Sequence, residues 1–465
     1  MIFGEEYDSE KIISSSLSED GHYLIMSLYY GSSGSKTEIY YKDLFNDTPV
    51  IPLVNDIDAE FYGSVAGDIM YMKTNWKASN WRIIAADLTN PSKENWSEVI
   101  PNSEAVIENF SLTGGKIFVN YLENVNSHVE IYTPDGKEAG EISFPSLGTV
   151  SGVYGHWDGN EAFYQFTSFH IPSTIYHYDL STDEQEIWAQ QNVPVNTDNI
   201  EVKQIWFQSK DGTKVPMFVV HKKGLELDGN NPTYLTGYGG FNSSYKPYFS
   251  STAVLWVEQG GIYVVTNLRG GGEFGDAWHR AAMFEKKQNT FDDFIAAAEW
   301  LIENKYTSPS KLAIAGGSNG GLLVGAALTQ RPDLFQAVLC SYPLLDMLRY
   351  HKFLVGSFWI SEYGSADSAE QFEYIYKYSP YHNVHQGTKY PSVFFVTGDA
   401  DTRVDPCHAR KMTALLQSAT TPDNPVLLYY DTKAGHSRGT PLTKRIDDQV
   451  VKIGFLSWQL GMNWE

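Results

Sequence analysis

The segment Lys311-Leu-Ala-Ile-Ala-Gly-Gly-Ser-Asn-Gly-Gly-Leu-Leu323 is the most informative part of this chain. It reads as a short apolar strand, then G-x-S-x-G at Gly316, Ser318 and Gly320, then an Ala- and Leu-rich helix. The glycines let the chain turn sharply from strand to helix without Cβ clashes, and the turn exposes the serine hydroxyl. The helix N-terminus and the Asn319 backbone N–H then face the place where an oxyanion would form. The segment predicts the nucleophile elbow of an α/β-hydrolase.

G-x-S-x-G also fits a flexible glycine-rich loop, so the residues that follow decide between the two interpretations. The apolar run Pro391–Thr397 predicts a buried strand of a parallel sheet. It leads into residues 398–406, where the catalytic groups of such sheets gather at the carboxyl ends of strands. Asp399 and Asp401 both qualify there as the acid of a catalytic triad, whereas Asp405 fits a helix N-cap.

A histidine follows the next predicted strand, Val426–Asp431, in the loop Thr432–His436. The loop after the last strand is where this fold carries its general base, although a solvated loop histidine is the alternative. The order Ser318, then an aspartate, then His436 is that of α/β-hydrolases and differs from the chymotrypsin and subtilisin orders. The sequence therefore predicts a Ser-His-Asp hydrolase.

Several separated motifs resemble those of the prolyl oligopeptidase family of serine peptidases, from about residue 200 to the C-terminus. They are G-Y-G-G-F-N at 237–242, N-L-R-G-G-G-E-F-G at 267–275, G-G-S-N-G-G-L-L at 316–323, Y-S-P at 378–380, D-T-R-V at 401–404 and A-G-H at 434–436. The resemblance implies that Asp401, two positions before the arginine of D-x-R, is the triad acid. It also implies that Arg403 binds a substrate main-chain carbonyl, a task that a planar fork of donors suits.

The resemblance implies further site residues. The Tyr238 hydroxyl is expected to be the second oxyanion donor, beside the Asn319 N–H. Trp359 is expected to stack on a proline ring, although on its sequence alone it reads as a core residue. The other expected pocket residues are Tyr363, Phe241, Val404 and Leu344. No carboxylate stands at these positions, which argues against an oligopeptidase B type of specificity for basic side chains.

The expected reaction is the hydrolysis of short peptides on the carboxyl side of proline through an acyl-enzyme. His436 takes the proton from Ser318, and Asp401 fixes the tautomer of the imidazole. No cofactor and no metal is expected. An acylaminoacyl-peptidase or an esterase on the same scaffold remains an alternative, as does a catalytically silent propeller that only binds.

The composition is consistent with a two-domain enzyme. The chain has 465 residues and is 42% hydrophobic, and its net charge of −22 argues against nucleic acid and anionic membranes as partners. The two cysteines, Cys340 and Cys407, form neither a disulfide framework nor a metal-ligand pattern. Neither a transmembrane run nor a signal-peptide pattern is visible. We expect the complete protein to be a monomer in the cytoplasm, with a periplasmic or secreted location as the alternative.

The pattern changes near residue 195. Before it, short runs rich in Tyr, Ile, Val and Phe alternate with turns, and the turn aspartates Asp43, Asp87, Asp135 and Asp179 are 44, 48 and 44 residues apart. Units of this length with about four strands each are typical of propeller blades, and a β-sandwich with chance spacing is the alternative. We expect residues 1–195 to form an incomplete β-propeller of about four blades. Family members have seven blades after an N-terminal segment, so the chain is expected to be N-terminally truncated and to start inside the propeller.

Residues 196–465 are expected to form the α/β-hydrolase domain, a mostly parallel, doubly wound sheet. Val215–His221, Thr233–Leu235 and Ile262–Asn267 read as strands. Thr290–Ile302 reads as an amphipathic helix, with Thr290 as its N-cap and two aspartates in its first turn. This alternation of strand and helix predicts a parallel sheet covered by helices.

Overall fold

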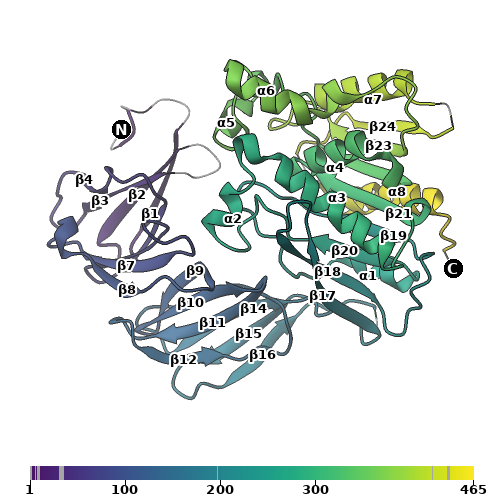
Figure 1. The fold of residues 1–465 in the computed structure, drawn as a ribbon. Coiled ribbons are helices and arrows are strands. Elements are labelled where there is room, and N and C mark those ends of the chain that lie inside the picture. The colour runs from purple at the N-terminus through teal and green to yellow at the C-terminus, as the bar shows by residue number, and fades with distance from the viewer. Residues whose placement is uncertain are drawn as a thin grey trace. The chain divides into compact units, whose positions relative to one another are not determined.

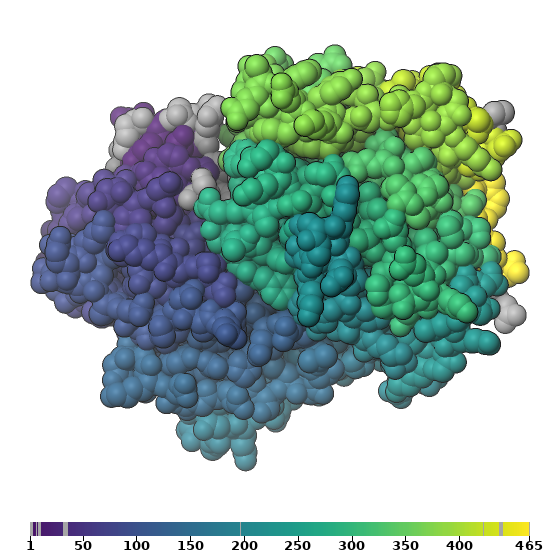
Figure 2. All heavy atoms as spheres, in the orientation of Figure 1, coloured from purple at the N-terminus to yellow at the C-terminus, as the bar shows by residue number. Residues whose placement is uncertain are grey.

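The computed structural model describes residues 3–5, 7, 11–30, 36–195, 197–421, 423–436 and 440–464. The chain forms two compact units, the first made of Met1–Pro194, Lys246–Phe249 and Glu273–Ala277. The second is made of Val195–Tyr245, Ser250–Gly272 and Trp278–Glu465. In Figure 2 most of the first unit is coloured purple to blue, and the second is teal to yellow.

In the residues described, the first unit consists of four antiparallel sheets with four strands each (Figure 1). In every sheet the strands that follow one another along the chain are hydrogen-bonded neighbours. The first two sheets are β1 (Lys11–Leu17), β2 (Tyr23–Tyr30), β3 (Thr37–Asp43), β4 (Ile51–Val54), and β5 (Phe61–Ala66), β6 (Ile69–Thr74), β7 (Arg82–Asp87), β8 (Ser97–Ile100). The other two are β9 (Val106–Thr113), β10 (Lys116–Glu123), β11 (Asn126–Tyr132), β12 (Glu138–Ile142), and β13 (Thr149–Tyr154), β14 (Glu161–Thr167), β15 (Thr174–Asp179), β16 (Gln185–Gln190).

The period of the turn aspartates reflects this repeat. Asp43, Asp87 and Asp179 end the third strands of their sheets, and Asp135 follows the third strand of the remaining one. The carboxylates of Asp87 and Asp179 each accept the backbone N–H two residues further on, at 2.8 Å. Such side-chain-to-backbone bonds close a tight turn, which is why aspartate recurs there. The prediction of four-stranded propeller units is confirmed, and the β-sandwich alternative is wrong.

The second unit is built on a sheet that, in the part of the chain described, has eight strands in the order β17-β18-β20-β19-β21-β22-β23-β24. The first two pairs are antiparallel and every later pair is parallel. The bounds are β17 (Ile200–Gln208), β18 (Lys214–Lys222), β19 (Thr233–Thr236), β20 (Ile262–Thr266), β21 (Leu312–Gly317), β22 (Ala337–Ser341), β23 (Ser392–Gly398) and β24 (Val426–Asp431). Every residue of β20 and β23 is buried, as expected for strands covered on both faces.

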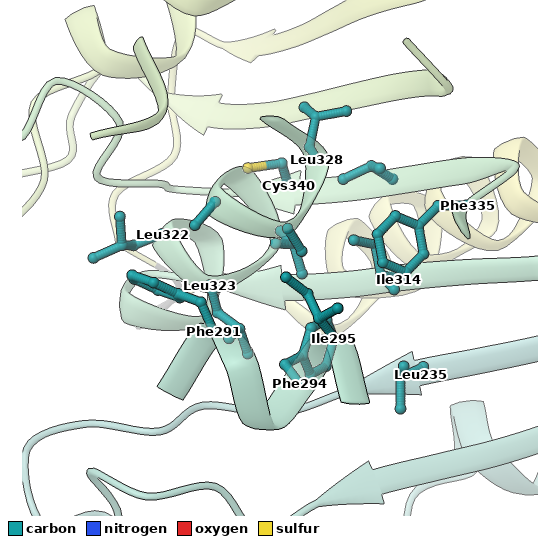
Figure 3. Packing of buried hydrophobic residues seen from close by; sticks show 14 of the residues in the cluster. Leu235, Phe291, Phe294, Ile295, Ile314, Leu322, Leu323, Leu328, Phe335 and Cys340 are labelled. Carbon is teal, nitrogen blue, oxygen red and sulfur yellow. The ribbon is translucent and has the colours of Figure 1, made fainter. Parts of the chain in front are cut away.

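Helices cover this sheet, and the predicted fold class is confirmed. The helices are α1 (Ser251–Glu258), α2 (Asp276–Arg280), α3 (Gln288–Glu303), α4 (Asn319–Gln330), α5 (Ile360–Tyr363), α6 (Ala369–Tyr378), α7 (Cys407–Ala419) and α8 (Leu442–Leu460). Figure 3 shows Phe291 of α3 beside Leu323 of α4, and Phe294 of α3 and Ile314 of β21 belong to the same buried cluster. Burying a side chain of this size contributes about 1.5–3 kcal/mol, so these contacts fix α4 on the sheet.

The predicted helix at Thr290–Ile302 is α3, but the prediction for its first turn is wrong. The helix begins two residues earlier, and Thr290 is a buried residue inside it. Its hydroxyl donates to the carbonyl oxygens of Arg269 at 3.0 Å and Gly239 at 3.3 Å. Asp293 is also buried and pairs with the Arg269 guanidinium instead of stabilising the helix N-terminus. Contacts with distant segments, which capping rules do not include, position both side chains.

Candidate active site

Ser318 occupies a strained turn between β21 and α4. Its backbone has φ 59° and ψ −119°, a conformation that costs a residue with a side chain on the order of 1–3 kcal/mol. A Cβ on Gly316 would lie 2.0 Å from the carbonyl oxygen of Gly320, so a side chain at 316 does not fit. The Ser318 N–H donates to the Ser341 carbonyl oxygen at 2.9 Å, which ties the turn to β22. This geometry is that of a nucleophile elbow.

The sheet brings the four predicted catalytic positions to one edge. Ser318 directly follows β21, Tyr238 lies two residues after β19, Asp401 three after β23 and His436 five after β24. These strands are parallel, so their carboxyl ends lie at the same edge. Residues that are up to about 200 positions apart in the sequence are thereby placed around one site.

Asp401 and His436 form a hydrogen-bonded pair. The distance between His436 Nδ1 and Asp401 Oδ2 is 2.6 Å, and the carboxylate is buried. Asp401 Oδ1 accepts the backbone N–H groups of Arg403 at 2.8 Å and Val404 at 2.9 Å, which fixes the orientation of the carboxylate. Because an ionised carboxylate only accepts, Nδ1 carries the proton and Nε2 is left free to accept one. This is the state that a general base needs.

The other two candidate carboxylates have different partners. Asp399 is exposed and accepts the Tyr430 hydroxyl. Asp405 accepts the backbone N–H of Cys407, the first residue of α7, at 2.8 Å, but the N-cap of that helix is Pro406 and not Asp405 as predicted. Of the two candidate acids after β23, Asp401 is the one that the structure joins to His436.

Two donors lie where the oxyanion is expected. Asn319 is the first residue of α4, and the N–H of a first helical residue has no partner within its own helix. Burial raises the pKa of the Tyr238 phenol, while its hydrogen bond with Ser318 and the charge of Arg403 act in the opposite direction. The phenol is therefore protonated at neutral pH, and its hydroxyl is available as a donor close to the nucleophile.

The predicted pocket residues belong to one hydrophobic cluster. Leu344, Trp359, Tyr363 and Val404 are buried in it, and Phe241 packs against it. The rings of Phe241 and Tyr363 stand edge to face, with centroids 5.4 Å apart and an interplanar angle of 89°. The stacking of Trp359 on proline stays a prediction, because a core residue would be buried in the same way.

The comparisons with known proteins agree with this architecture. Residues 247–463 match the profile of the prolyl oligopeptidase family, and residues 1–191 match that of its N-terminal β-propeller domain. A solved structure described as one of two prolyl endopeptidases superimposes with a TM-score of 0.94 at 43% identity, over 98% of this chain and 67% of the other. The chain belongs to the prolyl oligopeptidase family.

Curated relatives align along almost the whole chain. The prolyl endopeptidase of Elizabethkingia meningoseptica is 39% identical over 464 residues, which cover 99% of this chain. Prolyl oligopeptidase A of Galerina marginata is 33% identical over 480 residues. The chain spans 65% of the length of the first relative and 64% of that of the second. A structure of prolyl oligopeptidase B from Galerina marginata bound to a 25mer macrocyclization substrate has a TM-score of 0.94 at 33% identity, over all of this chain and 66% of the other.

The sequence analysis missed three polar side chains around Tyr238. The Asn319 carboxamide donates to the Tyr238 carbonyl oxygen at 2.6 Å and accepts the Tyr363 hydroxyl at 2.7 Å. Lys287 and Glu362 are buried nearby. One signal for Glu362 was present in the sequence, since it is a carboxylate inside the aromatic stretch that supplies Trp359 and Tyr363.

The described part of the chain contains no metal-binding cluster. Among these residues, no group of three or more His, Cys, Asp or Glu side chains could hold a metal ion. Cys340 and Cys407 are free thiols. No helix within the described ranges has both the length and the apolar character needed to cross a membrane.

Proposed function

We propose that the chain is a serine endopeptidase that hydrolyses short peptides on the carboxyl side of proline. One observation carries the proposal: Asp401 and His436 are hydrogen-bonded to each other, and the strands that precede them end at the same sheet edge as the Ser318 elbow. Acyl transfer requires a nucleophile and a histidine of fixed tautomer, and here both lie at the same sheet edge.

The geometry supports an acyl-enzyme mechanism. His436 Nε2 takes the Ser318 proton while the serine oxygen attacks the carbonyl carbon of the scissile bond. The Asn319 N–H and the Tyr238 hydroxyl donate to the oxyanion that forms. His436 then gives its proton to the leaving amine as the C–N bond breaks. Water, activated by the same imidazole, releases the acyl group from Ser318 and restores the enzyme.

Shape and the relatives support a preference for proline. A pyrrolidine ring has an apolar face and no N–H, which suits contact with aromatic side chains such as Trp359, Phe241 and Tyr363, which belong to one hydrophobic cluster. Arg403 is exposed beside Asp401 and next to Tyr238, where its guanidinium can bind the peptide main chain. The curated relative of Elizabethkingia meningoseptica is named a prolyl endopeptidase, and the Galerina marginata structure holds a 25mer substrate.

A substrate panel tests the proposal. The purified chain should cleave a blocked Gly-Pro amide faster than a Gly-Arg amide, an acetyl-Ala amide or a simple ester, and Ser318→Ala should abolish the cleavage. Fastest cleavage of the acetyl-Ala amide would favour an acylaminoacyl-peptidase, and cleavage of the ester alone an esterase. Failure of a fluorophosphonate to label Ser318 would instead favour a propeller protein that only binds.

The remaining partner predictions stay proposals. The acidic charge supports a protein with no nucleic-acid or membrane partner. A monomeric state and a location in the cytoplasm are predictions from the sequence that analytical ultracentrifugation and cell fractionation would test.

A further inference from the structure

The oxyanion loop, residues 237–242, has a strained backbone conformation that contacts from other segments must stabilise. Gly239 has φ +63°, and Phe241 and Asn242 have φ values of 57° and 55°. Residues with a Cβ rarely adopt this conformation, which is strained and persists only where the surroundings impose it. The loop carries Tyr238, so whatever imposes its conformation also places the phenol.

Contacts from outside the loop hold three of its backbone groups. The Lys287 ammonium donates to the Gly239 carbonyl oxygen at 2.7 Å. The Phe241 N–H donates to Glu362 Oε1 at 3.0 Å. The Asn319 carboxamide holds the Tyr238 carbonyl oxygen at 2.6 Å. The peptide groups on both sides of the strained residues are thus fixed by side chains from three other segments.

Lys287 and Glu362 are charged residues in the interior of this unit. The Lys287 side chain is 1% exposed and the Glu362 side chain is fully buried, with Nζ and Oε1 3.5 Å apart. Glu362 Oε2 also lies 2.8 Å from His279 Nε2. Burial lowers the pKa of Lys287, and the charge of Glu362 partly offsets this. Burial alone would raise the pKa of Glu362, but His279 and Lys287 outweigh it, so its pKa is below the usual value.

A buried ion pair is a poor source of stability, because the cost of desolvation about equals the attraction between the charges. Apolar residues of similar volume often stabilise a core as well or better. Here both charges instead make hydrogen bonds to backbone groups of a strained loop. Their arrangement therefore indicates a role in positioning this loop.

We propose that Lys287 and Glu362 are positioning residues that clamp the oxyanion loop and so keep the Tyr238 hydroxyl on the oxyanion. This clamp rests on the proposed function. Glu362 directly precedes Tyr363 and lies three residues after Trp359, so the segment expected to form the proline pocket also grips the oxyanion loop.

The test is a double-mutant cycle between Lys287→Met and Tyr238→Phe. Lys287→Met should lower kcat for the Gly-Pro amide by about 10- to 100-fold, since a displacement of about 1 Å in a catalytic group can cost 100-fold. KM should change less than about threefold, because the contact acts on the transition state. In the Tyr238→Phe background the same substitution should cost less than about threefold, since the hydroxyl that the clamp places is already absent.

Control variants separate positioning from folding. Lys286→Met changes the exposed neighbouring lysine and should leave kcat unchanged. Rates are expressed per active site that a fluorophosphonate labels. Lys287→Met leaves Glu362 as a buried charge without its lysine partner, so the variant with both Lys287→Met and Glu362→Gln repeats the cycle without either charge. This double variant tests the clamp if Lys287→Met alone does not fold.

Two results would overturn the clamp. One is an equal loss of kcat in the wild-type and Tyr238→Phe backgrounds, which would show that Lys287 does not act through the phenol. The other is an unchanged kcat per labelled site in both clamp variants. The rate of fluorophosphonate labelling of Ser318 provides an independent readout, since its phosphoryl oxygen uses the same donors whatever the peptide specificity. Wild-type protein that reacts rapidly with the fluorophosphonate but rejects the Gly-Pro amide would refute the proposed function and still leave the clamp testable.

Discussion

Replacing Asp401 by asparagine changes the donor and acceptor pattern of the acid–base pair while preserving its shape. In the structure, Oδ1 of Asp401 accepts two backbone N–H groups, from Arg403 and Val404, and Oδ2 accepts the Nδ1 proton of His436. An asparagine side chain has one oxygen and one NH2 group. The oxygen must face the two N–H donors, so the NH2 group replaces Oδ2, 2.6 Å from Nδ1.

Two donors cannot share a hydrogen bond, so the imidazole must move its proton from Nδ1 to Nε2. His436 then presents an N–H to Ser318 and cannot accept the serine proton. The rate should fall by about 10⁴, the usual cost of fixing the wrong tautomer in a triad of this type. By transition-state arithmetic that factor is about 5.4 kcal/mol. The fold should be retained, because the two backbone N–H groups keep their acceptor.

The assay is kcat and KM for a blocked Gly-Pro amide, with fluorophosphonate labelling to count active sites. Asp399→Asn is the matched control, since Asp399 is exposed and contacts Tyr430 instead of His436. It should keep kcat within about threefold of wild type. A larger loss for Asp399→Asn than for Asp401→Asn would refute the reasoning and move the acid to position 399.

Three other substitutions have defined outcomes. Trp359→Ala should reduce selectivity for Pro over Ala at the cleaved position by about 1–3 kcal/mol in kcat/KM ratios, and unchanged selectivity would exclude the stacking role. Tyr238→Phe should lower kcat by about 10²–10³ with KM nearly constant, and a change in KM alone would mean that the phenol binds the ground state. Arg269→Met should destabilise the fold by about 3–5 kcal/mol in urea unfolding, because it leaves the buried Asp293 carboxylate unpaired. The control Arg331→Met, on a partly exposed ion pair, should cost less than about 1 kcal/mol, and similar losses for both would refute the burial argument.

Local patterns predicted the elements of the second unit well. The strands predicted at Val215–His221 and Thr233–Leu235 lie in β18 and β19, and the one predicted at Ile262–Asn267 is β20, which ends one residue earlier. A short run of apolar residues bounded by turns is typical of a buried strand, so these strands could be predicted. The glycines that flank Ser318 likewise indicate the sharp turn at the nucleophile elbow. The first turn of α3 was predicted wrongly, because the Thr290 hydroxyl donates a hydrogen bond to the Gly239 carbonyl oxygen and does not cap its own helix.

The clamp could not be predicted from local patterns. Lys287 and Glu362 are 75 positions apart in the sequence, and neither local segment links the two charges to each other or to the oxyanion loop. Only their packing against the strained oxyanion loop gives them hydrogen-bond partners. The two charges are unusual because they are buried, and the burial of a residue is known only once the chain is folded.

The residue types and the order of the predicted catalytic groups follow from local sequence, because the elbow, the strands and the loops after them are local patterns. The glycines around Ser318, the apolar run before Asp401 and the loop of His436 each specify their own short segment. Which carboxylate meets His436, and which side chains hold Tyr238 in place, depends instead on how the segments are brought together in three dimensions. The physical reason is that a hydrogen bond depends on distance and direction to within a few tenths of an ångström, and those are set when the parallel strands bring distant segments to one edge.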